Sequence, residues 1–326
     1  MFNSLNIMVV KIIKYSKEYN NIWDDFVSNE LFGTIYHTRQ FISYHPENRF
    51  IDESILVYNE NEELVTVLPC CKKENKYFSY SGATYGGPVV SKKYYKFKYM
   101  KIIIDSIFEY YDNKIEFRLA NDIYFKESCY ILYFLLSQKT TIYPELSWYV
   151  NTNDNFIDNI LNKRNKTILN KQLKDKSITC DHSNETNDYI TFHSILTKNL
   201  NTNHNTNPTH SLDEFLKIKE ILNDKQILYL IRDKKNILGG VYIIKVTSQC
   251  WYSFYISRNI EVCNSSISVM YLMYKISCDA KKENVKYVDY GISTEECGKV
   301  INEGLTEYKE NSLGGISNYR YLFLIK

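Results

Sequence analysis

A polar loop that follows a strand near the carboxyl end is the feature of this sequence that most limits its fold. The string KYVDYGISTEEC at 286–297 begins inside a predicted strand, 285–290, and then turns polar. A short amphipathic segment at 300–309 and the glycines Gly314 and Gly315 come next. Because open α/β sheets bind ligands at the carboxyl ends of their strands, we expect functional side chains in this loop. An ordinary strand–loop–helix connection has the same pattern, since most loops carry no site.

The same stretch resembles the carboxyl-terminal pattern of FemAB-like acyltransferases in the GNAT superfamily. The matching blocks, in order, are DYGIS at 289–293, NEGL at 302–305, YKE at 308–310 and GG at 314–315. The chain departs from the pattern at Ser312 and Leu313, because an aromatic residue is more usual before the glycines. The resemblance implies an α/β fold with a mixed sheet, built as two tandem GNAT-like (acyl-CoA N-acyltransferase) domains.

The order of predicted elements supports a tandem repeat. The first half has predicted strands at 54–58, 64–71 and 76–81, a helix at 92–112 and a strand at 114–119. The second half has predicted strands at 227–232, 237–246 and 250–256, a helix at 265–283 and a strand at 285–290. We therefore predict an N-terminal domain at 1–150 that shapes the acceptor cleft. The C-terminal domain, 151–326, would carry the acyl-transfer site.

Composition excludes several classes of function. A length of 326 residues allows two domains. The net charge of +2 gives no strong field toward nucleic acid, so we expect no DNA partner. The eight cysteines include no CxxC pair, which argues against a zinc site, and we predict no metal. The sequence contains neither a run of 18 apolar residues nor a signal-peptide pattern, and we expect a cytoplasmic chain with free thiols.

Two residues of the carboxyl-terminal block are the predicted catalytic groups. In the resembled family the lysine of the aromatic-Lys-Glu block, here Lys309, is implied to face the acyl carbonyl. Attack of an amine on a thioester places negative charge on the carbonyl oxygen, and a fixed cation stabilises that charge in the transition state. Alternatively, Lys309 balances the dipole at a helix end. Asp289 is expected to lie in the same cleft.

His210 is the third predicted catalytic residue. Ser211 and Glu214 form a capping box at the start of a predicted helix, and His210 comes immediately before it. The PTHS string at 208–211 also recurs in relatives of the resembled family. An imidazole there can take a proton from an attacking amine at neutral pH, although a local hydrogen-bonding role is an alternative.

The predicted substrate-binding residues are spread over both halves; they are His37, Tyr85, Arg164, Tyr255, Ser293 and Glu295. His37 lies where the first domain of this superfamily often places a substrate-binding residue. Tyr85 precedes two glycines, which would permit close approach of the backbone to a ligand. An ordinary turn is the alternative interpretation of these glycines. Arg164 lies on a basic predicted helix, 155–175, and a guanidinium binds phosphate through two parallel bonds. A solvated basic face is the alternative for that helix.

The acyl donor is left open by the sequence. The glycine-rich coenzyme A signature of GNAT domains would follow the strand at 250–256, but SRNIEVCNSSISV at 257–269 contains no glycine. A helix amino terminus at Asn264, Ser265 and Ser266 can bind an anion instead, and we predict cofactor binding there. Acyl-CoA, with acetyl-CoA as the expected form, would be a co-substrate, and no permanently bound cofactor is expected.

We therefore predict an acyltransferase, of the N-acetyltransferase type, that acts on an amine. The resemblance to acetyltransferases of polysaccharide pathways suggests a cell-surface sugar, or its nucleotide-linked precursor, as the acceptor. One alternative is aminoacyl transfer from tRNA to a peptidoglycan precursor, although the polar stretch at 176–211 leaves no room for the helical hairpin of some such enzymes. Another is a GNAT fold that binds a ligand without catalysis.

Overall fold

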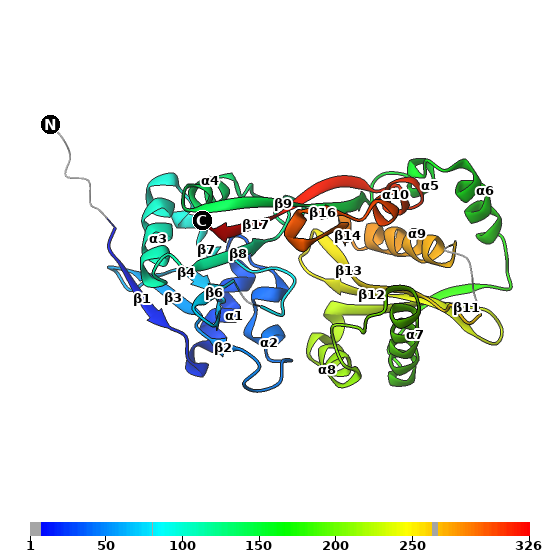
Figure 1. The fold of residues 1–326 in the computed structure, drawn as a ribbon, viewed down its shortest axis with the longest axis horizontal. Helices are drawn as coiled ribbons and strands as arrows, with labels where there is room; N and C mark the ends of the chain where they lie inside the picture. Colours follow the sequence, from blue (N-terminus) through cyan, green and yellow to red (C-terminus); the bar gives the residue numbers. More distant parts are fainter. Residues whose placement is uncertain (1–7, 80, 263–266) are drawn as a thin grey trace. The chain divides into compact units, whose positions relative to one another are not determined.

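The computed structural model describes residues 8–79, 81–262 and 267–326, which form two compact units. The first unit comprises Met1–Pro144 and Arg320–Lys326, and the second comprises Glu145–Tyr319 (Figure 1). Strands β9 (Thr140–Asn151) and β17 (Ile316–Ile325) contribute residues to both. The sequence assigned residues 320–326 to the second domain, whereas they lie in the first unit.

The second unit is built on a mixed sheet with the strand order β10-β11-β12-β13-β14-β9. Neighbouring strands are antiparallel except β13 and β14, which are parallel and are joined by helix α9 (Ile267–Lys282). This arrangement confirms the predicted order of three strands, a helix and a strand. The other strands of this sheet are β10 Thr179–Ser183, β11 Gln226–Arg232, β12 Ile237–Lys245, β13 Cys250–Arg258 and β14 Tyr287–Ile292.

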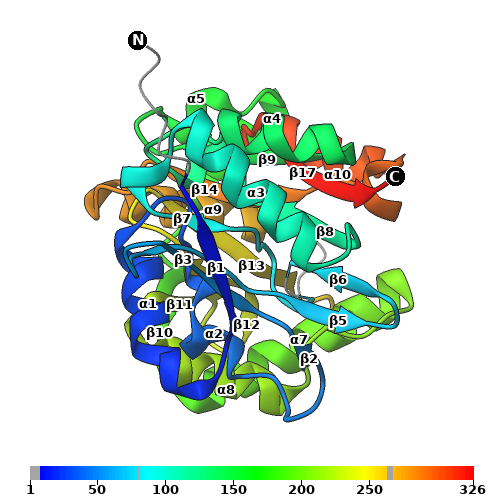
Figure 2. The same ribbon diagram turned by 90° about the vertical axis from the view of Figure 1, so that its left-hand side faces the viewer.

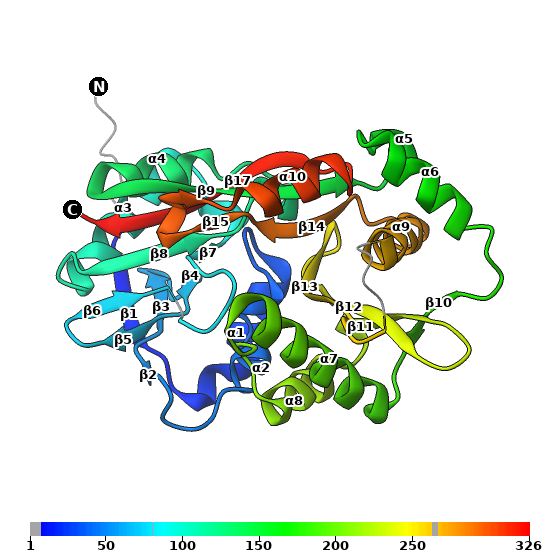
Figure 3. The same ribbon diagram turned by 45° about the vertical axis from the view of Figure 1, so that its right-hand side comes forward.

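Helices cover both faces of this sheet. On one face α9 packs against the strands, and Ile243 of β12 belongs to that core. On the other face lie α7 (Thr186–His204) and α8 (Leu212–Leu222) (Figure 3). There the rings of Tyr242 and Phe215 are in contact, with centroids 4.8 Å apart. Successive residues of a strand point to opposite faces, which is why a nearly continuous apolar strand such as β12 fits here.

One helical prediction in the second unit was wrong, and one helix of this unit was not predicted. The predicted helix at 155–175 is two helices, α5 (Phe156–Asn159) and α6 (Lys163–Gln172). They are separate because Asn162 caps α6, its side-chain oxygen accepting a hydrogen bond from the backbone N–H of Asn165 at 3.1 Å. The polar stretch at 176–211 was not predicted to be helical, yet it contains the 19-residue α7, which buries one apolar stripe against the sheet.

The first unit contains an antiparallel sheet with the order β1-β3-β4-β7. Helices α3 and α4 share a core with one face of this sheet, and α1 packs on the other (Figure 2). The bounds are β1 Val10–Lys14, α1 Asn20–Asn29, β3 Ile55–Asn59, β4 Leu64–Leu68, β7 Val89–Val90, α3 Phe97–Tyr110 and α4 Tyr130–Lys139.

The predicted strand at 64–71 is divided at Pro69 between two sheets. Its first part is β4, and its end begins β5 (Cys71–Lys73). Proline has no N–H to donate to a ladder, so the chain changes partners at this residue. Strand β5 pairs in antiparallel orientation with β2 (Ile51–Asp52) and with β6 (Lys76–Phe78). Strand β6 in turn pairs in parallel with β8 (Ile115–Leu119).

Within the described part of the chain, every helix is too short or too polar to span a lipid bilayer.

Candidate functional site

The two parallel strands of the second unit part near their carboxyl ends. Strand β13 pairs with β14 from Cys250 to Tyr252, opposite Tyr287 to Asp289. At the next residue the Ser253 hydroxyl donates to the backbone carbonyl of Asp289 at 2.6 Å. In the described ladder no pair of β13 and β14 follows, although β13 continues to Arg258. This side of β13 therefore has backbone groups that β14 does not use.

A β-bulge lies in β13 where the strands part. Ile243 of β12 pairs with Ser253, and Tyr242 pairs with Tyr255, so Phe254 is an extra residue between them. Bulges bend a strand, increase its twist and occur often beside active sites. The bend accounts for the divergence of β13 from its parallel neighbour.

Helix α10 (Glu303–Asn311) places Lys309 at the end of β14. The Lys309 side chain is buried, with 4% of the residue exposed. Its ammonium donates to the carbonyls of Gly291 at 3.0 Å and Ile292 at 2.7 Å. A cation is therefore fixed at the carboxyl end of the strand, where the sequence predicted the site.

The side chains of Asp289 and Lys309 both bond to the backbone of Gly291. Its carboxylate oxygen Oδ1 accepts a hydrogen bond from the backbone N–H of Gly291 at 2.6 Å and from the Ser147 hydroxyl at 3.4 Å. The pairing of β14 with β9 shifts register between Asp289 and Gly291, and Gly291 has a φ of +73°. The carboxylate thus stabilises an irregular backbone conformation that glycine adopts without strain.

The glycine pair after α10 allows close packing at the end of this helix. Gly314 has a φ of +62°, and a β-carbon there would lie 2.7 Å from the β-carbon of Asn159. A β-carbon on Gly315 would lie 2.8 Å from the Lys309 carbonyl oxygen, which accepts the Gly315 N–H at 2.9 Å. Both glycines of the sequence block therefore have a steric reason in the structure.

Asn302 connects the polar loop to α10. Its side-chain oxygen caps the helix by accepting from the backbone N–H of Leu305 at 3.0 Å, and its amide donates to Glu295 at 3.1 Å. Its own N–H donates to the carbonyl of Ser293 at 2.9 Å. The sequence predicted roles for Ser293 and Glu295 but none for Asn302, which appeared only in the matching NEGL block, although asparagine before a helical segment is a recognisable cap. Glu295 is exposed, whereas Ser293 is buried and its hydroxyl has no hydrogen-bond partner among the described atoms.

His210 and Tyr255 form a hydrogen-bonded pair beside the bulge. The Nδ1 atom of His210 lies 2.6 Å from the Tyr255 hydroxyl, and the His210 ring packs on Phe254 with centroids 5.3 Å apart. Burial raises the pKa of Tyr255 to about 12, so its hydroxyl keeps its proton at neutral pH. The predicted capping box of Ser211 and Glu214 is present, and it orients the residue before it.

The structure does not place the remaining predicted site residues of the second unit beside Lys309, Asp289 or His210. Arg164 is an exposed residue near the start of α6. Asn264, Ser265 and Ser266 lie outside the described residues. In the part of the chain that is described, no three His, Cys, Asp or Glu side chains gather in a way that could hold a metal ion.

In the first unit, His37 and the loop after Tyr85 come together. His37 is buried, its Nδ1 accepts the Thr34 N–H at 3.2 Å, and its ring contacts the main chain of Gly86 and Gly87. Burial lowers the pKa of His37 to about 4, a shift that these hydrogen bonds only partly oppose. Tyr85 is also buried, with its ring 5.7 Å from the Arg320 guanidinium. Both predicted substrate-binding residues therefore lie inside the unit and hold its loops.

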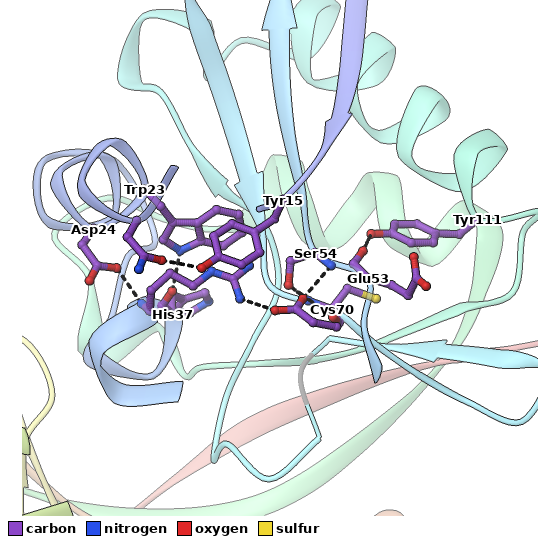
Figure 4. A network of polar contacts seen from close by, with 11 residues as sticks. Tyr15, Trp23, Asp24, His37, Glu53, Ser54, Cys70 and Tyr111 are labelled. Carbon is purple, nitrogen blue, oxygen red and sulfur yellow. Dashed lines mark hydrogen bonds and ion pairs between the residues drawn. The ribbon is translucent and has the colours of Figure 1, made fainter. Parts of the chain in front are cut away.

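A stacked arginine fixes the segment that carries His37. The Arg39 guanidinium lies 3.3 Å from the ring centroid of Tyr15 and 4.1 Å from that of Trp23, and it forms an ion pair with Asp52 at 2.7 Å. The Trp23 indole donates to the carbonyl of His37 at 2.8 Å (Figure 4). Arginine favours such stacked sites because its guanidinium is planar and weakly hydrated.

Because the imidazole of His37 is buried, we predict that the stability of the first unit depends on pH. The pKa of His37 is about 4 in the folded chain and 6.5 without perturbation, so unfolding takes up a proton between these values. The stabilisation is complete above pH 6.5 and is lost as the pH falls toward 4. In urea unfolding, the unmodified protein should lose about 3 kcal/mol more stability between pH 7 and pH 4 than His37→Gln does. The same loss in His37→Gln, or its absence in an exposed His204→Gln control, would contradict this assignment.

Comparisons with known proteins find similarity in structure alone. No family model and no curated protein sequence matches the chain. FemX superposes with a TM-score of 0.68 at 12% identity over 97% of both chains. L-PGS from Bacillus licheniformis has a TM-score of 0.59 at 8% identity, covering 94% of this chain and 91% of its own. A tandem GNAT protein from the clavulanic acid biosynthesis pathway has a TM-score of 0.52 at 6% identity, covering 97% and 98%. These likenesses confirm the predicted fold class.

Proposed function

On the tandem GNAT fold that this chain shares with FemX, we propose an acyltransferase that moves an acyl group from acyl-CoA to an amine. The observation that carries the proposal is the parting of β13 from β14 after the Ser253–Asp289 bond. An extended ligand with amide groups can add to an unused strand edge through main-chain hydrogen bonds. The pantetheine arm of coenzyme A is such a ligand, and acetyl-CoA is the form we expect.

The side chains near this gap supply the groups that the reaction needs. The amine nitrogen attacks the thioester carbon, a C–N bond forms, and the C–S bond breaks. Lys309 would stabilise the negative charge on the carbonyl oxygen. The proton lost by nitrogen would pass to His210, which Tyr255 orients, and end on the leaving sulfur. Asp289 would act as a positioning residue, because its carboxylate holds the backbone of Gly291.

The acceptor that we propose is an amino sugar of a cell-surface polysaccharide or its nucleotide-linked precursor. This part rests on the resemblance of the carboxyl-terminal block to acetyltransferases of such pathways. In the first unit, His37 would contribute indirectly, since its ring contacts the main chain of the loop that follows Tyr85.

Aminoacyl transfer from tRNA is a second candidate, and the surface of α6 favours it. Exposed basic side chains lie along this helix and in the turn that follows it; they are Lys163, Arg164, Lys171, Lys174 and Lys176. Phosphate contacts of this kind dominate nucleic-acid affinity and weaken steeply with salt. Strongly salt-dependent binding of aminoacyl-tRNA, without binding of acetyl-CoA, would favour this candidate over the first.

Amide hydrogen exchange tests where the donor binds. Acetyl-CoA at about 100 times its dissociation constant should slow exchange in residues 253–258 of β13 by up to about 100-fold, which corresponds to about 2.7 kcal/mol. The paired residues 226–230 of β11 serve as an internal control and should change little. Binding of acetyl-CoA that leaves 253–258 unprotected would contradict the proposed location.

A further inference from the structure

A cavity of the second unit lies beside the end of β13. It has a volume of about 560 Å³. Helix α7, the turn between β11 and β12, and the two residues Asn259 and Glu261 after β13 form its walls. Its charged side chains are Lys198, Arg232, Lys234, Lys235, Asp233 and Glu261. Four cations against two acids give the cavity a net charge of +2.

The acids in this cavity are already engaged. Glu261 accepts two hydrogen bonds from Lys198, each 2.9 Å long. Asp233 accepts the backbone N–H groups of Lys235 and Asn236, both at 2.7 Å, and these bonds lower the pKa of its carboxyl group. The Asp233 carboxylate therefore stays ionised and holds the turn instead of meeting a ligand.

Two cations of the turn remain available. Arg232 forms ion pairs with Asp188 at 2.6 Å and Asp181 at 3.7 Å. By contrast, the ammonium groups of the exposed Lys234 and Lys235 form no ion pair and no hydrogen bond among the residues that the structure describes, although the charge of Lys235 contributes to the lowered pKa of Asp233. Lys234 and Lys235 are adjacent in the chain, and two flexible ammonium groups on the wall of one cavity suit a compact dianion.

The cavity adjoins the strand to which the donor is proposed to bind. Gly239 of β12 pairs with Arg258, the last residue of β13, so the turn lies at the same end of the sheet as the parting strands. Strand β11 is two places from β13 in the sheet, a distance of about 10 Å. A nucleotide that continues from the thioester arm beyond the end of β13 meets this positive surface.

We propose that this cavity binds the 3′-phosphomonoester of coenzyme A, through Lys234 and Lys235. The inference rests on the proposed function, because it takes acyl-CoA as the donor. Lysine binds phosphate as a point charge, and charge-assisted bonds are stronger than neutral ones. The cavity would then supply donor affinity from side chains of the β11–β12 turn, in a chain that lacks the glycine-rich phosphate loop.

Calorimetry with coenzyme A and 3′-dephospho-coenzyme A tests the proposal. The unmodified protein should bind coenzyme A about tenfold more tightly than the dephospho form. In K234A/K235A the two ligands should bind with equal affinity, because the difference between them is the phosphate alone. Asp233 preserves the turn in this variant, since it bonds to backbone N–H groups.

A charge-matched variant separates local contact from the general field. K217A/K225A removes two exposed lysines outside the cavity and should keep the tenfold preference. The proposal is overturned if K234A/K235A keeps the preference, or if the unmodified protein binds both ligands equally. If the protein binds neither ligand, the donor assignment itself fails and this inference falls with it.

Discussion

Replacing Lys309 with methionine is expected to slow acyl transfer at least 100-fold. Methionine keeps most of the apolar stem but removes the ammonium that we assign to the carbonyl oxygen of the reacting thioester. Loss of one such donor costs roughly 100- to 1000-fold in turnover. Lys309→Arg should recover part of the rate, since it keeps the charge but not the compact geometry. Steady-state kinetics with saturating donor and acceptor measure the effect.

The same substitution should also destabilise the second unit. Lys309 donates to two carbonyls at the end of β14, and each acceptor left without a partner costs about 1–3 kcal/mol. We therefore expect Lys309→Met to lower the free energy of unfolding by about 2–6 kcal/mol. Lys286→Met, at an exposed residue just before β14, should change neither quantity. A variant that loses stability but keeps its turnover while folded would limit Lys309 to a structural role, and unchanged turnover and stability would remove both roles.

Alanine at Gly314 is expected to be the most damaging small substitution in the carboxyl-terminal block. The left-handed conformation costs an alanine roughly 1–2 kcal/mol, and contact with Asn159 adds about 1–3 kcal/mol of overpacking. Gly304→Ala is a matched control, because a β-carbon there meets nothing within 4 Å and the residue lies in α10. It should stabilise the protein by about 0.5–1 kcal/mol. Thermal unfolding of both variants checks the contrast, and equal effects would contradict it.

Local patterns predicted the second unit better than the first. The strands and helix from 226 to 292 have regular apolar periodicity, and their order was predicted correctly. The first unit divides a continuous apolar run at Pro69, and the change of sheet depends on distant strands. The 12-residue β9 and the 10-residue β17 were not predicted, because their alternation is weak and their stability comes from neighbouring strands.

The candidate site was predicted only in part, because its side chains are visible in the sequence but most of their contacts join distant residues. The resemblance singled out Lys309 and Asp289, which the structure brings to one residue, Gly291. The Lys309 ammonium meets its carbonyl partners only through packing of α10 on β14, and a sequence does not display such contacts. The Asp289 carboxylate bonds to the N–H two residues further on and to Ser147 of the distant strand β9. Ser253 and Ser147 were missed because a serine inside a strand carries no local signal for the bond that it makes.

Transfer of an isotopically labelled acetyl group from acetyl-CoA to an amine tests the central claim most directly. The chain should be incubated with labelled acetyl-CoA and a panel of amino sugars and their nucleotide-linked forms, and the products analysed by mass spectrometry. We predict an amide-linked label on the acceptor, with one free coenzyme A released for each label and with little product from Lys309→Met. Absence of product from acetyl-CoA, together with transfer from aminoacyl-tRNA or from neither donor, would contradict the account.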